Sequence, residues 1–336
     1  MLTFALLAAL QTTAAPAEVK TFGDWAVACD NARRCEMTSL IPGDGGFADE
    51  GSGYDDFDVS IVREAGAAGG FTVEVTLNKQ STGAVRLLAD GKPLAAVSPK
   101  GDSLVFTGAD AERIVAAMVQ AKELGLDKGG RASLAGSSAA LRFIDAAQGR
   151  AGTVTAAVAK GSKPASAVPA PAPLPTVPAV RVTGHAAPVS AALARSLFAR
   201  QPDCREAYEG GTGEWPEIET HALGGGKTLA LLPCGAGAYN FITVPLILGA
   251  GQPAVAGFDH PPGFTTAEAG PPMLVNASFD ATSGRLQSFA KGRGVGDCGS
   301  AEEYVWDGAR FRLVEARAMG ECRGSANWLT IWRAEA

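Results

Sequence analysis

The 336-residue sequence predicts a mainly β protein with a few short helices, arranged as two antiparallel β-rich domains. Short runs of alternating apolar residues recur along the chain, as in Phe57, Val59 and Ile61, and Gly clusters separate these runs. The chain holds 42 Gly and 20 Pro, which favours turns over long helices. Its length suits two domains, since single domains usually have roughly 100–200 residues.

Composition limits the classes of partner. Hydrophobic residues form 46% of the chain and charged residues 19%, which supports packed cores and excludes a disordered acidic chain. The net charge is −6. Non-specific binding to nucleic acid or to an anionic membrane needs clustered positive charge, so we expect neither partner. The most apolar internal stretch, residues 239–250, is too short to span a bilayer, so we expect no integral membrane span.

Residues 1–17 are expected to be a signal peptide. An apolar run from Leu2 to Leu10 precedes Ala15-Pro16-Ala17, which fits a small-x-small cleavage site before Glu18. No Lys or Arg precedes the run, and the alternative is a disordered start or a first buried strand. Export predicts a periplasmic or secreted protein.

Residues 18–159 are expected to form the first β-rich domain, of sandwich or barrel type. Its strand candidates are residues 25–29, 35–41, 57–61, 71–77, 85–88 and 104–106. Two helices are expected as well. Asp110 can cap an apolar stripe that begins at Ile114, and Ser137-Ser138 can cap a second helix that ends at Gly149.

A Pro- and Ala-rich linker is expected over residues 160–182, where prolines recur between Pro164 and Pro178. Proline at this density blocks helix and removes backbone donors, so the segment should be extended and act as a semi-rigid spacer. The alternative is a peptide that docks into an aromatic groove.

Residues 183–336 are expected to form a second β-rich domain, with a helix over residues 189–200 and an antiparallel meander after it. The strand candidates are residues 229–232, 239–248, 273–279, 286–289, 304–306, 311–314 and 328–332. Asp307-Gly308, between Trp306 and Phe311, is typical of a tight hairpin, and residues 282–285 form a second turn.

Six cysteines support export, because an even number in an exported chain is typical of disulfides. They are Cys29, Cys35, Cys204, Cys234, Cys298 and Cys322. If the two domains fold separately, Cys29 pairs with Cys35 across a hairpin loop, and the other four have three possible pairings. Sequential pairing is preferred because it closes the shortest loops. No pair has the C-x-x-C spacing of a zinc or redox site.

Several segments resemble a bacterial family, domain of unknown function 1176. They include Phe22-Gly23-Asp24-Trp25, Ser133 to Leu141, Gln148-Gly149-Arg150, Gly237-Ala238-Tyr239-Asn240 and Cys322-Arg323-Gly324. The opening, with its spaced cysteines, also resembles the invasion-associated locus B family of small exported β-proteins. The first resemblance implies an exported location and a β architecture, and it implies no particular chemistry.

No catalytic, metal or cofactor site is expected. The three histidines, His185, His221 and His260, accompany no nucleophile elbow and no metal motif. Gly226-Lys227-Thr228 lacks the upstream Gly of a phosphate loop, where His221 stands instead. Two acidic features are also interpreted as structural. The acidic run at residues 49–58 has the oxygen ligands for calcium but fits a solvated loop better, and Asp145 with Arg150 fits an ion pair or a helix cap.

The sequence therefore predicts a non-catalytic, exported binding protein whose partner is an envelope protein, a peptide or a glycan. Tyr239 and Asn240 are the candidate binding loop. Four of the five tryptophans, Trp215, Trp306, Trp328 and Trp332, suit a stacking surface less well than a core. One alternative is a hydrolase that acts on wall glycan or peptide with Asp and Glu, and the other is an inhibitor of the lysozyme or protease type.

Overall fold

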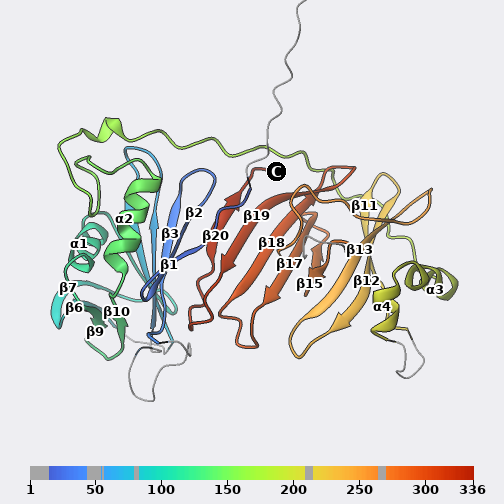
Figure 1. The fold of residues 1–336 in the computed structure, drawn as a ribbon, viewed down its shortest axis with the longest axis horizontal. Coiled ribbons are helices and arrows are strands. Elements are labelled where there is room, and N and C mark those ends of the chain that lie inside the picture. The colour runs from blue at the N-terminus through green and yellow to red at the C-terminus, as the bar shows by residue number, and fades with distance from the viewer. Residues whose placement is uncertain (1–14, 44–53, 55–56, 79–82, 209–214, 264–269) are drawn as a thin grey trace, which may run out of the picture.

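The computed structural model describes residues 15–43, 54, 57–78, 83–208, 215–263 and 270–336. It confirms a mainly β protein with short helices, built from four antiparallel sheets (Figure 1). None of these sheets closes into a barrel within the described parts of the chain. The described helices include none long and apolar enough to cross a membrane.

The first half of the chain contains a six-stranded sheet and a four-stranded sheet around one core. The large sheet has the order β1-β2-β3-β4-β5-β8, with β1 (Lys20–Phe22), β2 (Trp25–Cys29), β3 (Cys35–Ser39), β4 (Phe57–Arg63), β5 (Phe71–Leu77) and β8 (Ser103–Thr107). The small sheet has the order β10-β9-β6-β7, with β10 (Arg131–Ser133), β9 (Glu123–Leu126), β6 (Val85–Ala89) and β7 (Lys92–Val97). Strict alternation in β4 and β5 buries one face of the large sheet against this core.

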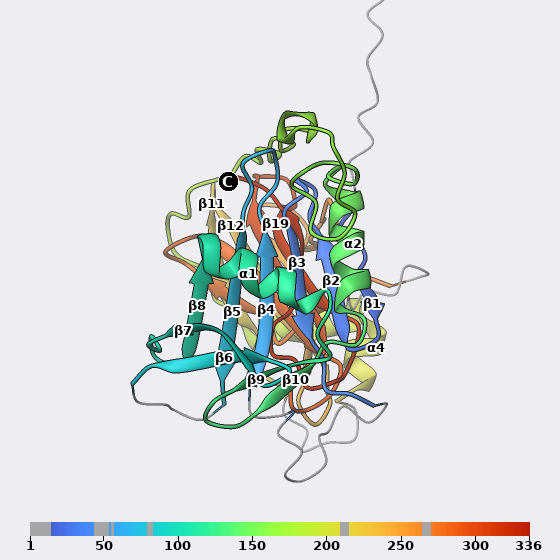
Figure 2. The same cartoon turned by 90° about the vertical axis from the view of Figure 1, so that its left-hand side faces the viewer.

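Two helices, α1 (Gly108–Met118) and α2 (Ser137–Ala147), cover the face of the large sheet that is turned away from the second half (Figure 2).

The helix caps expected at Asp110 and at Ser137-Ser138 are both wrong. The α1 helix begins after Thr107, and Asp110 lies in its first turn, where it pairs with Arg113. Gly136 precedes α2 in a left-handed conformation, and the Ser137 hydroxyl donates to the Met118 carbonyl, so packing fixes this helix start.

The second half is a sandwich of two sheets, each a meander as expected. One has the order β11-β12-β13-β14, with β11 (Glu219–Gly224), β12 (Lys227–Ala236), β13 (Phe241–Leu248) and β14 (Ala254–Val255), while β15 (Leu274–Val275) also pairs with β13. The other has the order β16-β17-β18-β19-β20, with β16 (Ser278–Asp280), β17 (Arg285–Lys291), β18 (Gly299–Trp306), β19 (Phe311–Met319) and β20 (Leu329–Arg333). Apolar side chains from both sheets form the core between them.

Helix α3 (Ala191–Arg200) packs on the remaining face of the first sandwich sheet through Leu197 and Phe198, and helix α4 (Pro202–Glu206) packs there through Cys204. The expected turn at Asp307-Gly308 joins β18 to β19, and the Asp307 carboxylate accepts hydrogen bonds from two N–H groups of that turn. The sequential repeat of strand and turn explains the meander.

The Pro-rich segment 160–182 runs along one side of the molecule from the first half to β11 (Figure 1). Apart from the short turn η1 (Ala165–Ala167), it contains no regular helix or strand. The N–H of Val177 donates to the Glu335 carbonyl and that of Val180 donates to the Trp306 carbonyl, both at 2.8 Å. Val177 is buried against Val305 and Val314, so backbone bonds and an apolar contact hold this segment on the second half.

Candidate functional site

Three segments that carry the family resemblance meet at Asp24, between β1 and β2. The N–H of Asp24 donates to the Ala135 carbonyl at 2.8 Å, and the Ser133 hydroxyl donates to its carboxylate at 2.6 Å. Arg323, which follows the last cysteine, donates to the same carboxylate and also to the carbonyls of Gly23 and Ile41. The Asp24 and Arg323 side chains are only 15% and 13% exposed. One mostly buried carboxylate therefore joins the start, middle and end of the chain.

Strand β20 ends the second sandwich sheet and lies against β2 and β3 of the first half. Side chains of the first half form hydrogen bonds with the backbone of β20. The Asn31 amide exchanges two hydrogen bonds with the backbone of Arg333, at 2.8 and 2.9 Å, and the Glu36 carboxylate accepts from the Thr330 N–H at 2.8 Å. Asp30 pairs with the Arg333 guanidinium. These bonds occupy a sheet edge that would otherwise be open to another strand.

Apolar side chains close the same contact. Ala26, Ala28 and Leu40 of the first half form one buried cluster with Cys298, Ala301, Met319, Trp328 and Leu329 of the second half. The contact is thus apolar at its centre and polar at its rim, which is typical of stable interfaces.

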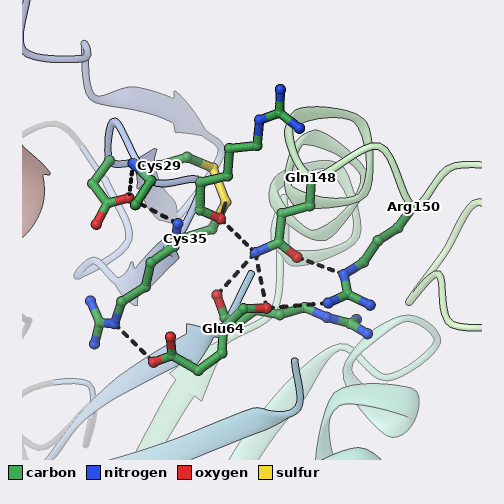
Figure 3. The surroundings of a disulfide bond; sticks show 10 residues. Cys29, Cys35, Glu64, Gln148 and Arg150 are labelled. Carbon is green, nitrogen blue, oxygen red and sulfur yellow. Dashed lines mark hydrogen bonds and ion pairs between the residues drawn. A yellow bond between two sulfur atoms is a disulfide. The ribbon is translucent and has the colours of Figure 1, made fainter. Parts of the chain in front are cut away.

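The structure pairs the cysteines sequentially, as Cys29–Cys35, Cys204–Cys234 and Cys298–Cys322, and the described residues contain no free cysteine. The first bridge joins paired residues of β2 and β3. Beside it, the Gln148 amide donates to the carbonyls of Arg33, Arg63 and Glu64 and accepts from Arg150 (Figure 3).

Arg150 is fully buried and donates to the carbonyls of Glu64, Gly66 and Gly69. Burial lowers the pKa of Arg150, and burial followed by the nearby charge of Arg150 lowers the pKa of Arg63 to about 10. Asp145 accepts three backbone N–H bonds, from Ala157, Val158 and Ala159. Asp145 and Arg150, which the sequence suggested as an ion pair or a helix cap, therefore both bind backbone groups. Their hydrogen bonds fix the chain after α2.

The Tyr239-Asn240 loop joins β12 to β13, and hydrogen bonds hold it at several points. The Asn240 amide exchanges two bonds with the backbone of Lys291, at 2.9 and 3.2 Å. Asn276 donates to the carbonyls of Tyr239 and Phe289 and accepts from the Phe241 N–H. Asn276 has a φ of 44°, in the left-handed region that Asn tolerates better than most residues. No sequence motif pointed to this residue.

Exposed apolar side chains lie on this loop and on the segments that contact it. Phe241 is 65% exposed and Val295 is 69% exposed, while Tyr239 and Phe289 are each more than one third exposed. The Tyr239 hydroxyl donates to the Gly292 carbonyl, and its ring lies against Gly294. We call Tyr239, Phe241, Phe289 and Val295 the aromatic surface.

Of the four tryptophans considered for a stacking surface, Trp306, Trp328 and Trp332 are buried, as a core role requires. Trp215 is 37% exposed and stacks on Phe198, with ring centres 4.4 Å apart. Together with Ile218 and Arg195 it lines a groove of about 730 Å³ beside α3.

Among the described residues, two carboxyl groups have raised pKa values, and both shifts come from burial. The pKa of Asp58 rises to about 6, and that of Glu302 also rises. Asp58 lies in β4 and contacts the Ala326 N–H, whereas Glu302 lies in β18 and accepts from the Gly263 N–H. They belong to different sheets, in different halves of the chain.

Glu302 shares its sheet with two other buried polar side chains, Tyr304 of β18 and Trp332 of β20. The Tyr304 hydroxyl, the Trp332 indole nitrogen and Glu302 Oε2 have no hydrogen-bond partner among the described residues. Burial, and then the charges of Glu302 and Asp259, raise the pKa of Tyr304. Asp259 is paired with Arg312. Among the residues that the structure describes, this arrangement offers one buried acid, without a second free carboxylate beside it.

The remaining sequence motifs lie in turns or pack against rings. Gly226-Lys227 turns β11 into β12, and Lys227 donates to the Gly308 carbonyl. His221 pairs with Glu219, and the His260 ring lies 5.2 Å from that of Trp332. The described residues contain no group of three His, Cys, Asp or Glu able to hold a metal ion. Most of the acidic run at residues 49–58 lies outside the described residues.

Comparison with known proteins gave three results. A family model described as protein of unknown function (DUF1176) matches residues 19–335. The uncharacterized protein YpfG of Escherichia coli (strain K12) is 32% identical over 364 aligned positions, which cover 98% of this chain and 96% of that protein. The crystal structure of invasion associated protein B from Bartonella henselae is 20% identical and covers 39% of this chain and 99% of that one, with a TM-score of 0.28.

Proposed function

Because this chain belongs to the DUF1176 family, whose description carries no activity, we propose from its structure that it is an exported, non-catalytic binding protein of the cell envelope. In this proposal residues 1–17 are the signal peptide, residues 18–159 and 183–336 are the two domains, and residues 160–182 join them. Three disulfides support an oxidising compartment.

The aromatic surface carries the proposal. Large apolar side chains that stay exposed together mark interaction sites more often than those scattered singly. Here the backbones of Tyr239, Phe241 and Phe289 are fixed by hydrogen bonds to the Asn276 side chain. A surface that is already ordered loses little entropy when a partner binds, which favours affinity.

The polar groups of the molecule also favour binding over hydrolysis. Glycan hydrolysis by two carboxyl groups needs them about 5–10 Å apart on either side of the bond. The two acids with raised pKa values, Asp58 and Glu302, lie in separate sheets, and Glu302 faces the core of the sandwich. The proposed role therefore rests on surface contacts.

An inhibitor of the lysozyme or protease type is the second candidate. The specific observation in its favour is the loop between β12 and β13, which the Gly237 N–H closes onto the Asn240 carbonyl at 2.7 Å. The Cys204–Cys234 bridge anchors the strand before it. An inhibition assay against lysozymes and extracellular proteases distinguishes this role from general binding.

The test is site-specific photo-crosslinking in living cells. A benzophenone side chain at Phe241, 65% exposed, should give discrete crosslinked products after illumination. The matched control is Val154, 57% exposed in the other half of the chain, which should give none. Digesting the products with a protease or with a glycan hydrolase identifies the class of partner. The absence of any product specific to position 241 would reject the proposed surface.

A further inference from the structure

A second feature adjoins Phe289 on the face of β17, β18 and β19 that is turned away from the sandwich core. It is a small hollow lined by Gln287, Phe289, Ala301, Glu303, Glu315 and Arg317. We call it the Ala301 hollow.

Strand register explains why the sheet is hollow at this point. Phe289 of β17 pairs with Ala301 of β18, and Ala301 pairs with Arg317 of β19. Side chains in directly paired positions share one face of an antiparallel sheet. The methyl group of Ala301, which also belongs to the buried cluster between the two halves, therefore leaves a small space between an aromatic ring and a long guanidinium side chain.

The next row of the same face is polar. Gln287 pairs with Glu303, and Glu303 pairs with Glu315. Arg285 and Gln287 both donate to the Glu303 carboxylate, while Arg317 pairs with Glu315 at 3.1 Å. Two guanidinium groups thus balance two carboxylates. The side chains of Glu315 and Arg317 are 44% and 51% exposed, so they keep free lone pairs and N–H groups for a ligand.

The ring that borders the hollow is held in place. Phe289 stacks on Trp328, with ring centres 4.6 Å apart and an interplanar angle of 14°. Trp328 is buried in the contact between the two halves, and Phe289 remains 36% exposed. An ordered aromatic face therefore stands beside planar groups that carry hydrogen-bond donors and acceptors.

We propose that the Ala301 hollow binds an uncharged sugar unit of an envelope glycan, an inference that rests on the proposed binding function and names its ligand class. Carboxylate, amide and guanidinium groups can each form two hydrogen bonds to neighbouring hydroxyls, and an aromatic ring contacts the C–H face of a sugar. The balanced charges favour a neutral ligand over an acidic one. Sites of this kind combine apolar surface with a few placed polar groups.

Calorimetric titration of the mature protein with soluble tetrasaccharides tests the inference. The probes are cellotetraose, maltotetraose, the tetramer of N-acetylglucosamine and, as the charged comparison, tetragalacturonate. At least one neutral probe should bind, and Arg317→Ala or Gln287→Ala should weaken that binding about tenfold or more. The matched control is Arg86→Ala, which removes an exposed arginine of a surface ion pair in the first half and should change nothing.

Two results would overturn the inference. One is that none of the neutral probes binds at millimolar concentration, and the other is that Arg317→Ala and Gln287→Ala leave binding unchanged. Phe241→Ala, outside the hollow, should retain sugar binding. Crosslinks from position 241 that persist without sugar binding would reject the sugar site while leaving the proposed binding function intact.

Discussion

Asp24 and Arg323 are 299 residues apart in the chain, and they form an ion pair that fastens the last segment of the protein to its first hairpin. The same carboxylate accepts from Ser133, so the pair belongs to a network and is mostly buried. Removing one partner of such a pair leaves the other charge uncompensated.

A double-mutant cycle over Asp24→Asn and Arg323→Ala should give a coupling energy of about 1–3 kcal/mol in urea unfolding. The control cycle uses Asp127 and Arg86, whose arginine is 63% exposed. Exposed pairs contribute less than about 1 kcal/mol, so that coupling should be small. Equal coupling in the two cycles would contradict a central role for Asp24.

Gly136 should tolerate no side chain. Its φ is 91°, and a Cβ atom would lie 1.8 Å from the Phe22 carbonyl oxygen. Gly136→Ala should therefore reduce the free energy of unfolding by at least about 2–3 kcal/mol, because backbone must move. Gly129 has a φ of 100° with open space around it, so Gly129→Ala isolates the conformational cost, about 1–2 kcal/mol. Similar losses in both variants would show that Phe22 and Gly136 are not in close contact.

Asp58 should make stability depend on pH. Burial raises its folded pKa to about 6, above its value in the unfolded chain, so ionisation opposes folding. The free-energy cost of ionising Asp58 in the folded protein is absent below about pH 4, grows as the pH rises towards 6 and then stays constant. Asp58→Asn should therefore match the parent at pH 4 and exceed its stability by up to about 3 kcal/mol at pH 7.

Urea unfolding at several pH values measures the Asp58 effect. Asp280→Asn is a control of opposite sign, because hydrogen bonds from Ser283 and Thr282 lower the pKa of Asp280. Asp280→Asn should be less stable than the parent at neutral pH, and this difference in stability should shrink as the pH falls. An Asp58→Asn variant that is less stable than the parent at pH 7 would refute the burial of this carboxyl.

The three disulfides should contribute unequally. Cys29–Cys35 spans 6 residues, while Cys204–Cys234 and Cys298–Cys322 span 30 and 24. Loop-closure entropy then gives about 2 kcal/mol for the first bridge and about 3.5 kcal/mol for each of the others. Paired Cys→Ser variants, compared by their urea midpoints, check this order. The largest loss for the 29–35 variant would contradict it.

Local patterns were sufficient for much of the fold. Alternation in Phe57, Val59 and Ile61 places β4, and Asp307-Gly308 places the turn between β18 and β19, because each depends on residues close in sequence. The position of the linker, with two cysteines before it and four after it, together with the preference for the shortest loops, likewise led to the sequential pairing that the structure has.

Contacts between distant segments could not be derived in the same way. Nothing near Arg323 indicates that its partner is Asp24, and nothing near Asn276 indicates that it binds both Tyr239 and Phe289. The helix starts differed from expectation for a related reason: tertiary packing places Gly136 against Phe22 and so decides where α2 begins. The Ala301 hollow depends on pairing across three strands, which a single strand pattern does not reveal.

The most direct test of the account asks where the mature chain resides and in what redox state. Cells expressing the protein are fractionated, and each fraction is denatured. The denatured protein is then treated with a thiol-reactive maleimide, either before or after its disulfides are reduced. Protein lacking residues 1–17 is expected in the envelope or periplasmic fraction, unlabelled until reduction and then labelled at all six cysteines. Full-length protein in the cytosol with six thiols labelled before reduction would contradict it.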